Sequence, residues 1–333
     1  MQTVNEIAHL GIREKLTIVF RVKTLIPTLS AVLALSIHLL IPNSPRYTLK
    51  ALPYFTNMLF AVTVITGVVV IVALFNEKVR QDYVFKSWFI GAAILLLNLL
   101  NVATLKLMIL PLMYFPSPEK IIKVFVEEWP FLLKCLGYSA RLLGYGLILG
   151  AVTGITTGIL VGWSKGWSYW VNPIIKVIGP IPSTAWIPVA LVSFATSFQA
   201  SVFLIALAVW FPTTVLTSSG ISNVKNAYFE VSSTLGANTV QKIFRIAVPD
   251  AMPSIFIGIF NGTCSSFITL MTAEMLGVKF GIGWYINWQR EMMAYANVYA
   301  GLIVIAVSFS LIITLMFKVR DRVLGWQKGV IKW

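Results

Sequence analysis

The sequence predicts an all-α polytopic membrane protein with about eight transmembrane helices. Apolar residues make up 58% of its 333 residues and charged residues only 11%, whereas soluble domains carry about 25% charged residues. Eight apolar stretches each approach the roughly 20 residues that a helix needs to cross a bilayer. The net charge of +14 comes from lysines and arginines spread over short loops, so we expect no nucleic-acid partner.

The predicted spans follow one another with polar connections. They lie at approximately Thr24–Pro42, Phe55–Phe75, Trp88–Leu112, Cys135–Gly162, Pro173–Phe194, Ala200–Gly220, Met252–Leu276 and Val298–Phe317. The fifth span is the least regular, because prolines interrupt it repeatedly between Pro173 and Pro188. Residues Met1–Lys23 are polar and basic, and they lack the apolar core and cleavage site of a signal peptide.

The distribution of basic residues predicts the orientation of the chain. With the N-terminus inside, seventeen lysines and arginines fall in cytoplasmic segments and seven in outer segments. Because an excess of these residues marks cytoplasmic loops, we expect both termini in the cytoplasm. The same orientation places residues 226–249 on the cytoplasmic side.

Residues 226–249 predict a helix-turn-helix elbow between the sixth and seventh spans. Asn226–Leu235 has helix length, and Gly236 lies where a helix C-terminus favours a left-handed residue. Asn238 and Gln241 have capping-box spacing for a second helix, after which Pro249 is suited to begin the next helix. The elbow also carries apolar residues for contacts: Tyr228, Phe229, Leu235, Val240, Ile243 and Phe244. An ordinary interhelical loop on the membrane surface is the alternative.

The seventh span carries a candidate translocation surface. Asn261, Ser265, Thr269 and Thr272 fall on one face of a helix with 3.6 residues per turn. An amide and three hydroxyls suit a water-lined passage, and interhelical hydrogen bonding is the alternative. In the fourth span, glycine recurs at every fourth residue from 146 to 162, which favours close helix packing over a substrate groove.

Few charged residues lie inside the spans. Arg141 and Glu274 each lie toward the outer end of a helix, and we hypothesise that they pair to close an outer gate. Lys106 is expected to extend its ammonium group to the membrane interface. Between the third and fourth spans, Pro116–Trp129 predicts an amphipathic outer helix capped by Ser117. This helix either anchors in lipid or helps to receive a substrate.

The elbow resembles the cytoplasmic loop of ATP-binding-cassette (ABC) import permeases. The pattern of that loop is Glu-Ala-Ala, three residues, Gly, nine residues, Ile-x-Leu-Pro. Here Glu230, Gly236, Ile246 and Pro249 keep the register. Val and Ser replace the two alanines, and Val248 replaces the leucine.

Roughly two thirds of the chain, from about Ile109 onward, resembles the permeases that import nitrate, sulfonate, taurine and bicarbonate. The matching stretches are Phe115–Glu119, Ser139–Arg141, the glycine-rich fourth span, Gly179–Pro188, the elbow, Ala273–Gly277 and Gly281–Trp284. The resemblance implies a six-span type I ABC importer permease core at 88–333. It leaves residues 1–87 as a basic segment with two additional transmembrane helices.

The resemblance also implies the machinery around this chain. It assigns ATPase coupling to Glu230, Leu235, Gly236, Ala237, Ile246 and Pro249. It implies no catalytic residue, metal or cofactor in this chain, because ATP and magnesium bind to two cytoplasmic ATPase subunits. An extracytoplasmic binding protein delivers the solute. The expected assembly is a homodimer, multi-pass in the bacterial cytoplasmic (inner) membrane.

The implied cargo is a small anion such as a sulfonate, taurine, nitrate or bicarbonate, with a neutral vitamin precursor as the alternative. A secondary transporter or channel is less favoured, because it gives no reason for the elbow spacing and the halves show no repeat. An integral-membrane enzyme would need a catalytic or metal cluster. The two histidines and two cysteines lie far apart in the sequence and suggest none.

Overall fold

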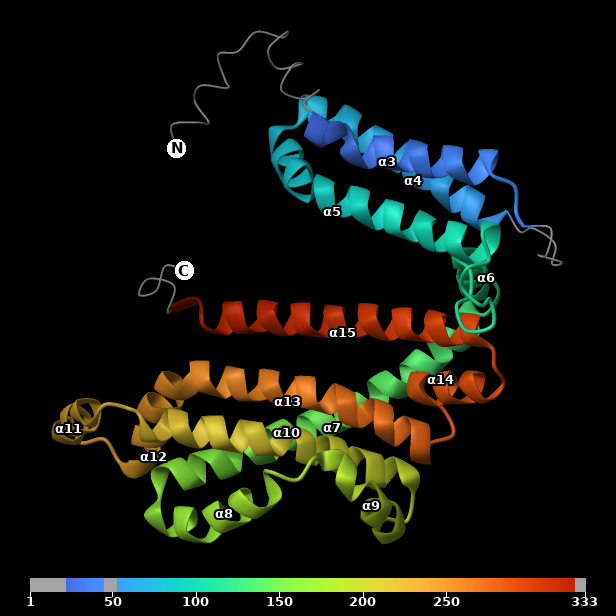
Figure 1. The fold of residues 1–333 in the computed structure, drawn as a ribbon. Helices are drawn as coiled ribbons and strands as arrows, with labels where there is room; N and C mark the ends of the chain where they lie inside the picture. Colours follow the sequence, from blue (N-terminus) through green and yellow to red (C-terminus); the bar gives the residue numbers. More distant parts are fainter. Residues whose placement is uncertain (1–21, 45–52, 327–333) are drawn as a thin grey trace, which may run out of the picture. The chain divides into compact units, whose positions relative to one another are not determined.

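The computed structural model describes residues 22–44 and 53–326, and every regular element in these ranges is a helix (Figure 1). Seven helices in the described ranges are long and apolar enough to cross a membrane. An eighth span forms if the bent pair Lys165–Ile178 and Ser183–Ser193, whose halves meet at 87°, counts as one. The predicted fold class is confirmed, and the break falls in the proline-interrupted fifth span.

Contacts divide the chain into two compact units. One unit comprises Met1–Glu128 with Met293–Ala300, and the other comprises Trp129–Met292 with Gly301–Trp333. The predicted boundary at residue 87 differs from this division, because the third span packs with the first two. The predicted N-terminal basic segment lies almost entirely outside the described residues.

The described part of the first unit contains three long helices, a short helix and the first residues of the final helix. These are α3 (Val22–Leu40), α4 (Tyr54–Phe75), α5 (Glu77–Asn101) with a π-helical turn at Val102–Lys106, and α6 (Pro118–Glu127). Ala31, Ala34, Phe55, Leu59 and Ile94 form its buried core.

Lys106 occupies a buried position in the first unit, and its ammonium group lies at the end of α3. Its side chain and backbone are only 7% exposed. The ammonium group donates a hydrogen bond of 2.7 Å to the carbonyl of His38 and another to the carbonyl of Ile41. The last carbonyls of a helix lack partners within the helix, so Lys106 closes the end of α3.

The helix α6 confirms that this segment is helical, but its predicted cap is wrong. Ser117 has the extended backbone of an N-cap residue, yet its hydroxyl makes no capping bond and is buried. The first turn is held instead by the carbonyl of Ser117, which accepts from the amide of Lys120 at 3.0 Å. An ion pair between Lys123 and Glu127, 3.6 Å apart, lies on the exposed part of the helix, while Val124 is buried.

The second unit carries the residues of the candidate sites. Its helices are α7 (Trp129–Trp163), α8 (Lys165–Ile178), η2 (Ser183–Trp186), α9 (Ile187–Ser193), α10 (Ser197–Ser222), α11 (Asn226–Thr234), α12 (Thr239–Lys242), η3 (Ile243–Ala247), α13 (Val248–Gly277) and α14 (Ile282–Glu291). The final helix, α15 (Tyr295–Val323), joins this unit from Gly301 onward.

The glycine ladder of α7 packs directly against α10, as close packing predicts. A Cβ atom on Gly150 would lie 2.5 Å from the Ala206 carbonyl oxygen, and one on Gly154 would lie 2.8 Å from the Cβ of Thr213. The other three glycines of the ladder meet α10 at similarly short distances. Because glycine has no side chain, the backbones of α7 and α10 approach each other closely along this ladder.

Candidate functional site

The elbow begins at the turn between α11 and α12, and Gly236 makes this turn possible. Gly236 has φ +78°, a left-handed conformation that glycine adopts without the steric cost of a Cβ atom. Immediately after it, the amide of Ala237 donates to the Ser232 carbonyl at 2.9 Å, which satisfies an end of α11. The predicted glycine turn is confirmed.

The second half of the elbow is locked by side chains. The Gln241 amide donates to the Asn238 side chain at 2.8 Å, and the Asn238 amide donates to the Gln241 side chain at 2.9 Å. This is the predicted capping box. The Lys242 ammonium group also crosses the turn and donates to the Ser233 hydroxyl at 2.7 Å. Together these bonds fix the angle between α11 and α12.

The second elbow helix does not stop before Pro249 as the sequence suggested. It continues through the π-helical turn of η3 into α13, so that Thr239–Gly277 is one continuous helix. Pro249 lies within the first turn of α13. The π-helical turn at Ile243–Ala247 re-forms the hydrogen-bonding pattern in another register, which accommodates a residue without a backbone donor.

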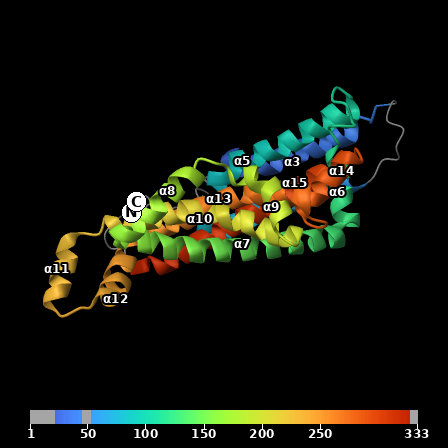
Figure 2. The ribbon, with the colours of Figure 1, turned by 90° about the horizontal axis from the view of Figure 1, so that it is seen from below.

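The elbow projects beyond the ends of α7 and α10 (Figure 2), and it carries exposed apolar side chains. Leu235 is 81% exposed and Phe244 is 63% exposed. Tyr228, Val231 and Val240 are also exposed. We call these five residues the elbow patch. A cluster of exposed large apolar residues on a segment that projects from the helix bundle marks an interaction surface.

The other elbow residues divide between anchoring and exposure. Phe229 packs edge-to-face on Trp163 of α7, with ring centres 5.4 Å apart, and so holds α11 to the spans. Ile246 packs on a buried cluster around Ala247 and Ala251. Glu230 is exposed and makes no ion pair with the part of the chain that the structure describes. Its carboxylate is therefore available to an external group.

The polar face of α13 is only partly open. Asn261 and Ser265 are exposed, Thr272 is intermediate, and Thr269 is 1% exposed. The hydroxyl of Thr269 lies 2.6 Å from the hydroxyl of Ser183, in the short helix η2 of the broken span. Thr269 therefore joins two helices, while Asn261 and Ser265 remain accessible, and their predicted place in a translocation path stays a prediction.

A pocket of about 380 Å³ lies beside the Ser183–Thr269 contact. Ser265 and Thr269 line it from α13, and Ser183 and Thr184 line it from η2. Sequence reasoning did not propose Ser183 or Thr184 as site residues. The signal was the proline-rich stretch Gly179–Pro188, because a broken helix can expose polar groups at membrane depth where it lines a cavity.

The predicted ion pair between Arg141 and Glu274 is not formed in this structure. The Arg141 guanidinium lies over the rings of Tyr145 and Phe198, at 5.9 and 5.4 Å from their centres. Glu274 is 1% exposed, and its carboxylate accepts a hydrogen bond of 2.8 Å from the Gly283 amide at the start of α14.

Glu274 and Ser139 both contact the start of α14. The Ser139 hydroxyl of α7 accepts a hydrogen bond of 2.9 Å from the Ile282 amide of α14. Gly281 has φ +136°, and a Cβ there would lie 2.4 Å from the Glu274 carboxyl carbon. The sequence stretches around Ser139, Glu274 and Gly281 thus form one cluster of contacts that joins α14 to α7 and α13.

The comparison with protein families decides the identity of the chain. Residues 150–324 match the family described as binding-protein-dependent transport system inner membrane component, which is more than half of the chain. The chain belongs to this family. Its members are permease components of ABC transporters, and the matched range contains the elbow, α13 and the broken span.

Individual relatives cover part of the chain. The putative aliphatic sulfonates transport permease protein of Bacillus subtilis is 28% identical over 224 residues, which are 64% of this chain and 78% of the relative. The taurine transport system permease protein of Escherichia coli is 28% identical over 48% of this chain and 58% of its own length. The nitrate import permease protein of a Synechocystis strain is 30% identical, over 48% and 56% respectively.

A solved structure shows the same fold. The match is to the MetNI methionine ABC transporter in an inward-facing conformation, with a TM-score of 0.50 and 17% sequence identity. It covers 59% of this chain and 98% of the matched chain. The matched chain is therefore reproduced almost entirely within this larger one.

Proposed function

We propose that this permease forms a homodimer that imports a small anion, driven by two cytoplasmic ATPase subunits that dock on its two elbows. The observation that carries the proposal is the elbow patch, because its large apolar side chains remain exposed where the elbow projects past α7 and α10. Each chain has one elbow, and two ATPase subunits need two. ATP and magnesium bind to the ATPase subunits, and this chain contributes no catalytic residue.

The continuous helix Thr239–Gly277 supplies the mechanical link. It begins in the elbow and carries Asn261, Ser265 and Thr269 at membrane depth. A continuous helix can transmit a displacement along its axis, because backbone hydrogen bonds join its successive turns. Closure of the ATPase subunits on ATP would therefore move the elbow and the polar face together, opening and closing the passage beside Ser183.

The proposed orientation places the elbow in the cytoplasm and α14 at the outer surface, where an extracytoplasmic binding protein delivers the solute. The excess of lysine and arginine in the segments on the elbow side supports it. Both termini are then cytoplasmic, in a bacterial inner membrane.

The cargo proposal rests on the relatives and on the chemistry of the polar face. Permeases named for aliphatic sulfonates, taurine, nitrate and bicarbonate are among the similar proteins. Asn261, Ser265, Ser183 and Thr184 offer neutral hydrogen-bond donors, which suit an anion that must pass without being held. A neutral vitamin precursor is the second candidate, since the same groups also bind uncharged heteroaromatic rings.

The test is ATP-dependent uptake by proteoliposomes that contain the permease, a candidate ATPase and a binding protein. Taurine, an alkylsulfonate, nitrate, bicarbonate and a neutral vitamin precursor are supplied in turn. We expect uptake of one of the anions, and only when ATP is supplied on the side of the membrane where the ATPase is bound. Uptake driven by an ion gradient without ATP would contradict the proposal.

The docking surface has its own test. Leu235→Ser should weaken ATPase binding, because it removes the most exposed apolar side chain of the elbow patch. Val192→Ser is the matched control, since Val192 in α9 is 89% exposed but lies outside the elbow. Equal binding by both variants would show that the elbow patch does not dock the ATPase.

A further inference from the structure

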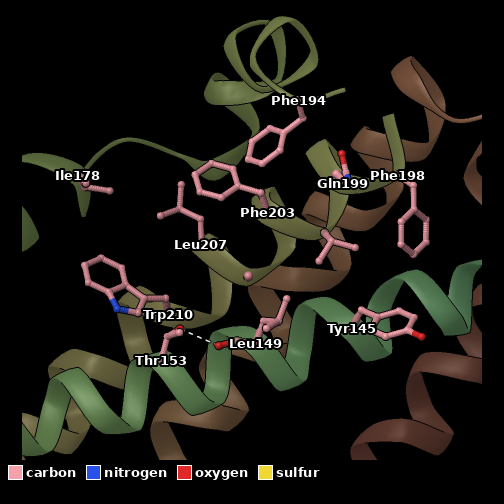
Figure 3. Close-up of a pocket in the computed structure, with 12 residues that line it drawn as sticks. Tyr145, Leu149, Thr153, Ile178, Phe194, Phe198, Gln199, Phe203, Leu207 and Trp210 are labelled. Carbon is pink, nitrogen blue, oxygen red and sulfur yellow. Dashed lines mark hydrogen bonds between the residues drawn. The ribbon is translucent and has the colours of Figure 1, made fainter. Parts of the chain in front are cut away.

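A second cavity lies between α7, α10 and the broken span, away from the polar face of α13 (Figure 3). Its volume is about 650 Å³, within the roughly 300–1,000 Å³ typical of small-molecule sites. Its walls are almost entirely apolar and include Leu149, Phe194, Phe203, Leu207 and Trp210. It shares only Ile178 and Leu207 with the pocket beside Ser183.

One end of this cavity carries two polar lining residues and lies next to the positive charge of Arg141, which does not itself line the cavity. Tyr145, Phe198 and Gln199 form that end, while Trp210 and Ile178 form the other (Figure 3). The Arg141 guanidinium lies over both rings of this end, 5.9 Å from the centre of Tyr145 and 5.4 Å from that of Phe198. Stacking on aromatic rings orients a guanidinium and leaves its N–H groups free to bind an oxyanion.

Arg141 has no acidic partner among the residues that the structure describes. The three ion pairs in these ranges join Arg80 to Glu77, Lys123 to Glu127, and Arg320 to Asp321. Arg141 is exposed, so its charge is available to a ligand that enters from outside the helix bundle. The charge next to the cavity end is thus complementary to an anion whose apolar part enters the cavity.

The cavity is placed where lipid can reach it. Phe198 lies in the first turn of α10, at the end of this span remote from the elbow, so Arg141 is level with the membrane interface. Leu149 and Phe203, on the two helices that form the walls, are 49% and 43% exposed. Both helices are membrane spans, so their open apolar walls face the region that acyl chains occupy.

We propose that this cavity binds an anionic phospholipid, with its phosphate on Arg141 and one acyl chain along Leu149, Phe203 and Leu207 toward Trp210. Arg141 and the Gln199 amide supply donors for the phosphate oxygens. The apolar walls bury the chain, and each buried methylene adds to the affinity. A phospholipid is favoured over a soluble amphiphile because the bilayer supplies it by lateral diffusion. This inference does not depend on the nature of the imported solute.

The headgroup contact is tested by titrating the purified full-length permease with phosphatidylglycerol or phosphatidylcholine and counting bound lipids by native mass spectrometry. We expect the wild-type chain to retain phosphatidylglycerol with at least tenfold higher affinity. Arg141→Gln should remove this preference, because a neutral side chain keeps its size but loses the charge-assisted bonds. Lys134→Gln is the matched control, since Lys134 also lies on α7 over a ring, that of Phe280, outside the cavity.

The binding of the acyl chain is tested by filling the cavity with a larger side chain. Leu149→Trp should reduce phosphatidylglycerol binding about tenfold, whereas Ile148→Trp should not, because Ile148 is 65% exposed and lies outside the cavity. Equal retention of both lipids by the wild-type chain, or equal effects of Arg141→Gln and Lys134→Gln, would overturn the proposal. Displacement of the lipid by dodecylsulfonate at equal concentration would assign the cavity to a soluble amphiphile instead. Disulfide-linked dimers of Leu149→Cys would assign it to a second copy.

Discussion

Replacing Gly236 with valine changes the backbone preference of the elbow without creating a clash. A Cβ atom at this position would meet nothing within 4 Å. The left-handed conformation costs a residue other than glycine about 1–2 kcal/mol, and a β-branched residue is the least tolerant. The bonds that hold the turn, from Ala237 to Ser232 and from Lys242 to Ser233, contribute about 0.5–1.5 kcal/mol each.

In Gly236→Val, the backbone cost therefore offsets most or all of the free energy that these bonds contribute, so the native turn has little or no advantage over other turn conformations. A loss of about 1–2 kcal/mol corresponds to a factor of about 5–30 in an equilibrium constant. We therefore expect Gly236→Val to raise the dissociation constant for the ATPase subunit by about this factor. The spans should be unaffected, because Gly236 makes no contact with them.

The assay is binding of the purified ATPase to permease in nanodiscs, together with the thermal stability of the permease alone. Gly236→Asn is the matched control, since asparagine tolerates the left-handed region and adds a side chain of similar size. We expect Asn to bind the ATPase much more tightly than Val, with unchanged stability for both. Wild-type affinity in Gly236→Val would refute the argument that the turn geometry presents the docking surface.

Three further substitutions test other parts of the structure. Gly154→Leu would place a Cβ 2.8 Å from a side chain of α10 and should destabilise the permease by about 1–3 kcal/mol or more. Gly144→Ala on the same helix is the control, because nothing lies within 4 Å of a Cβ at Gly144. Equal melting temperatures for the two variants would disprove the packing argument. Ser265→Leu should abolish solute uptake while ATPase activity persists, measured in the same proteoliposomes, whereas a parallel loss of both with thermal stability would indicate only a structural role. Gly281→Ala should separate α14 from Glu274 and so increase protease cleavage after α13. An unchanged cleavage pattern would show that these contacts tolerate the methyl group.

Local rules predicted much of the elbow from sequence. Gly236, Asn238 and Gln241 each act through the backbone of residues within a few positions, so their spacing is enough to identify a turn and a capping box. The glycine ladder of α7 was also readable, because its four-residue period leaves few uses other than a close helix contact. What these patterns could not show is that the helix after the elbow continues into α13 through a π-helical turn.

The contacts between distant segments were not predictable in the same way. Ser183 meets Thr269 only because the span before α10 breaks and bends, and no local pattern in η2 gives the direction of that bend. The Arg141–Glu274 pairing failed for a related reason. Opposite charges at similar depth suggested a pair, but the amide of Gly283 satisfies Glu274, and the rings of Tyr145 and Phe198 hold Arg141.

The most direct test of the coupling account is ATP hydrolysis by an ATPase subunit bound to the reconstituted permease, measured with wild-type chain and with Leu235→Ser. The account predicts that the wild-type permease binds two ATPase subunits per homodimer and that a solute-loaded binding protein stimulates their hydrolysis. It predicts that Leu235→Ser loses both binding and stimulation while the permease remains in the membrane. Full stimulation in this variant, or solute uptake by the permease with no ATPase bound, would contradict it.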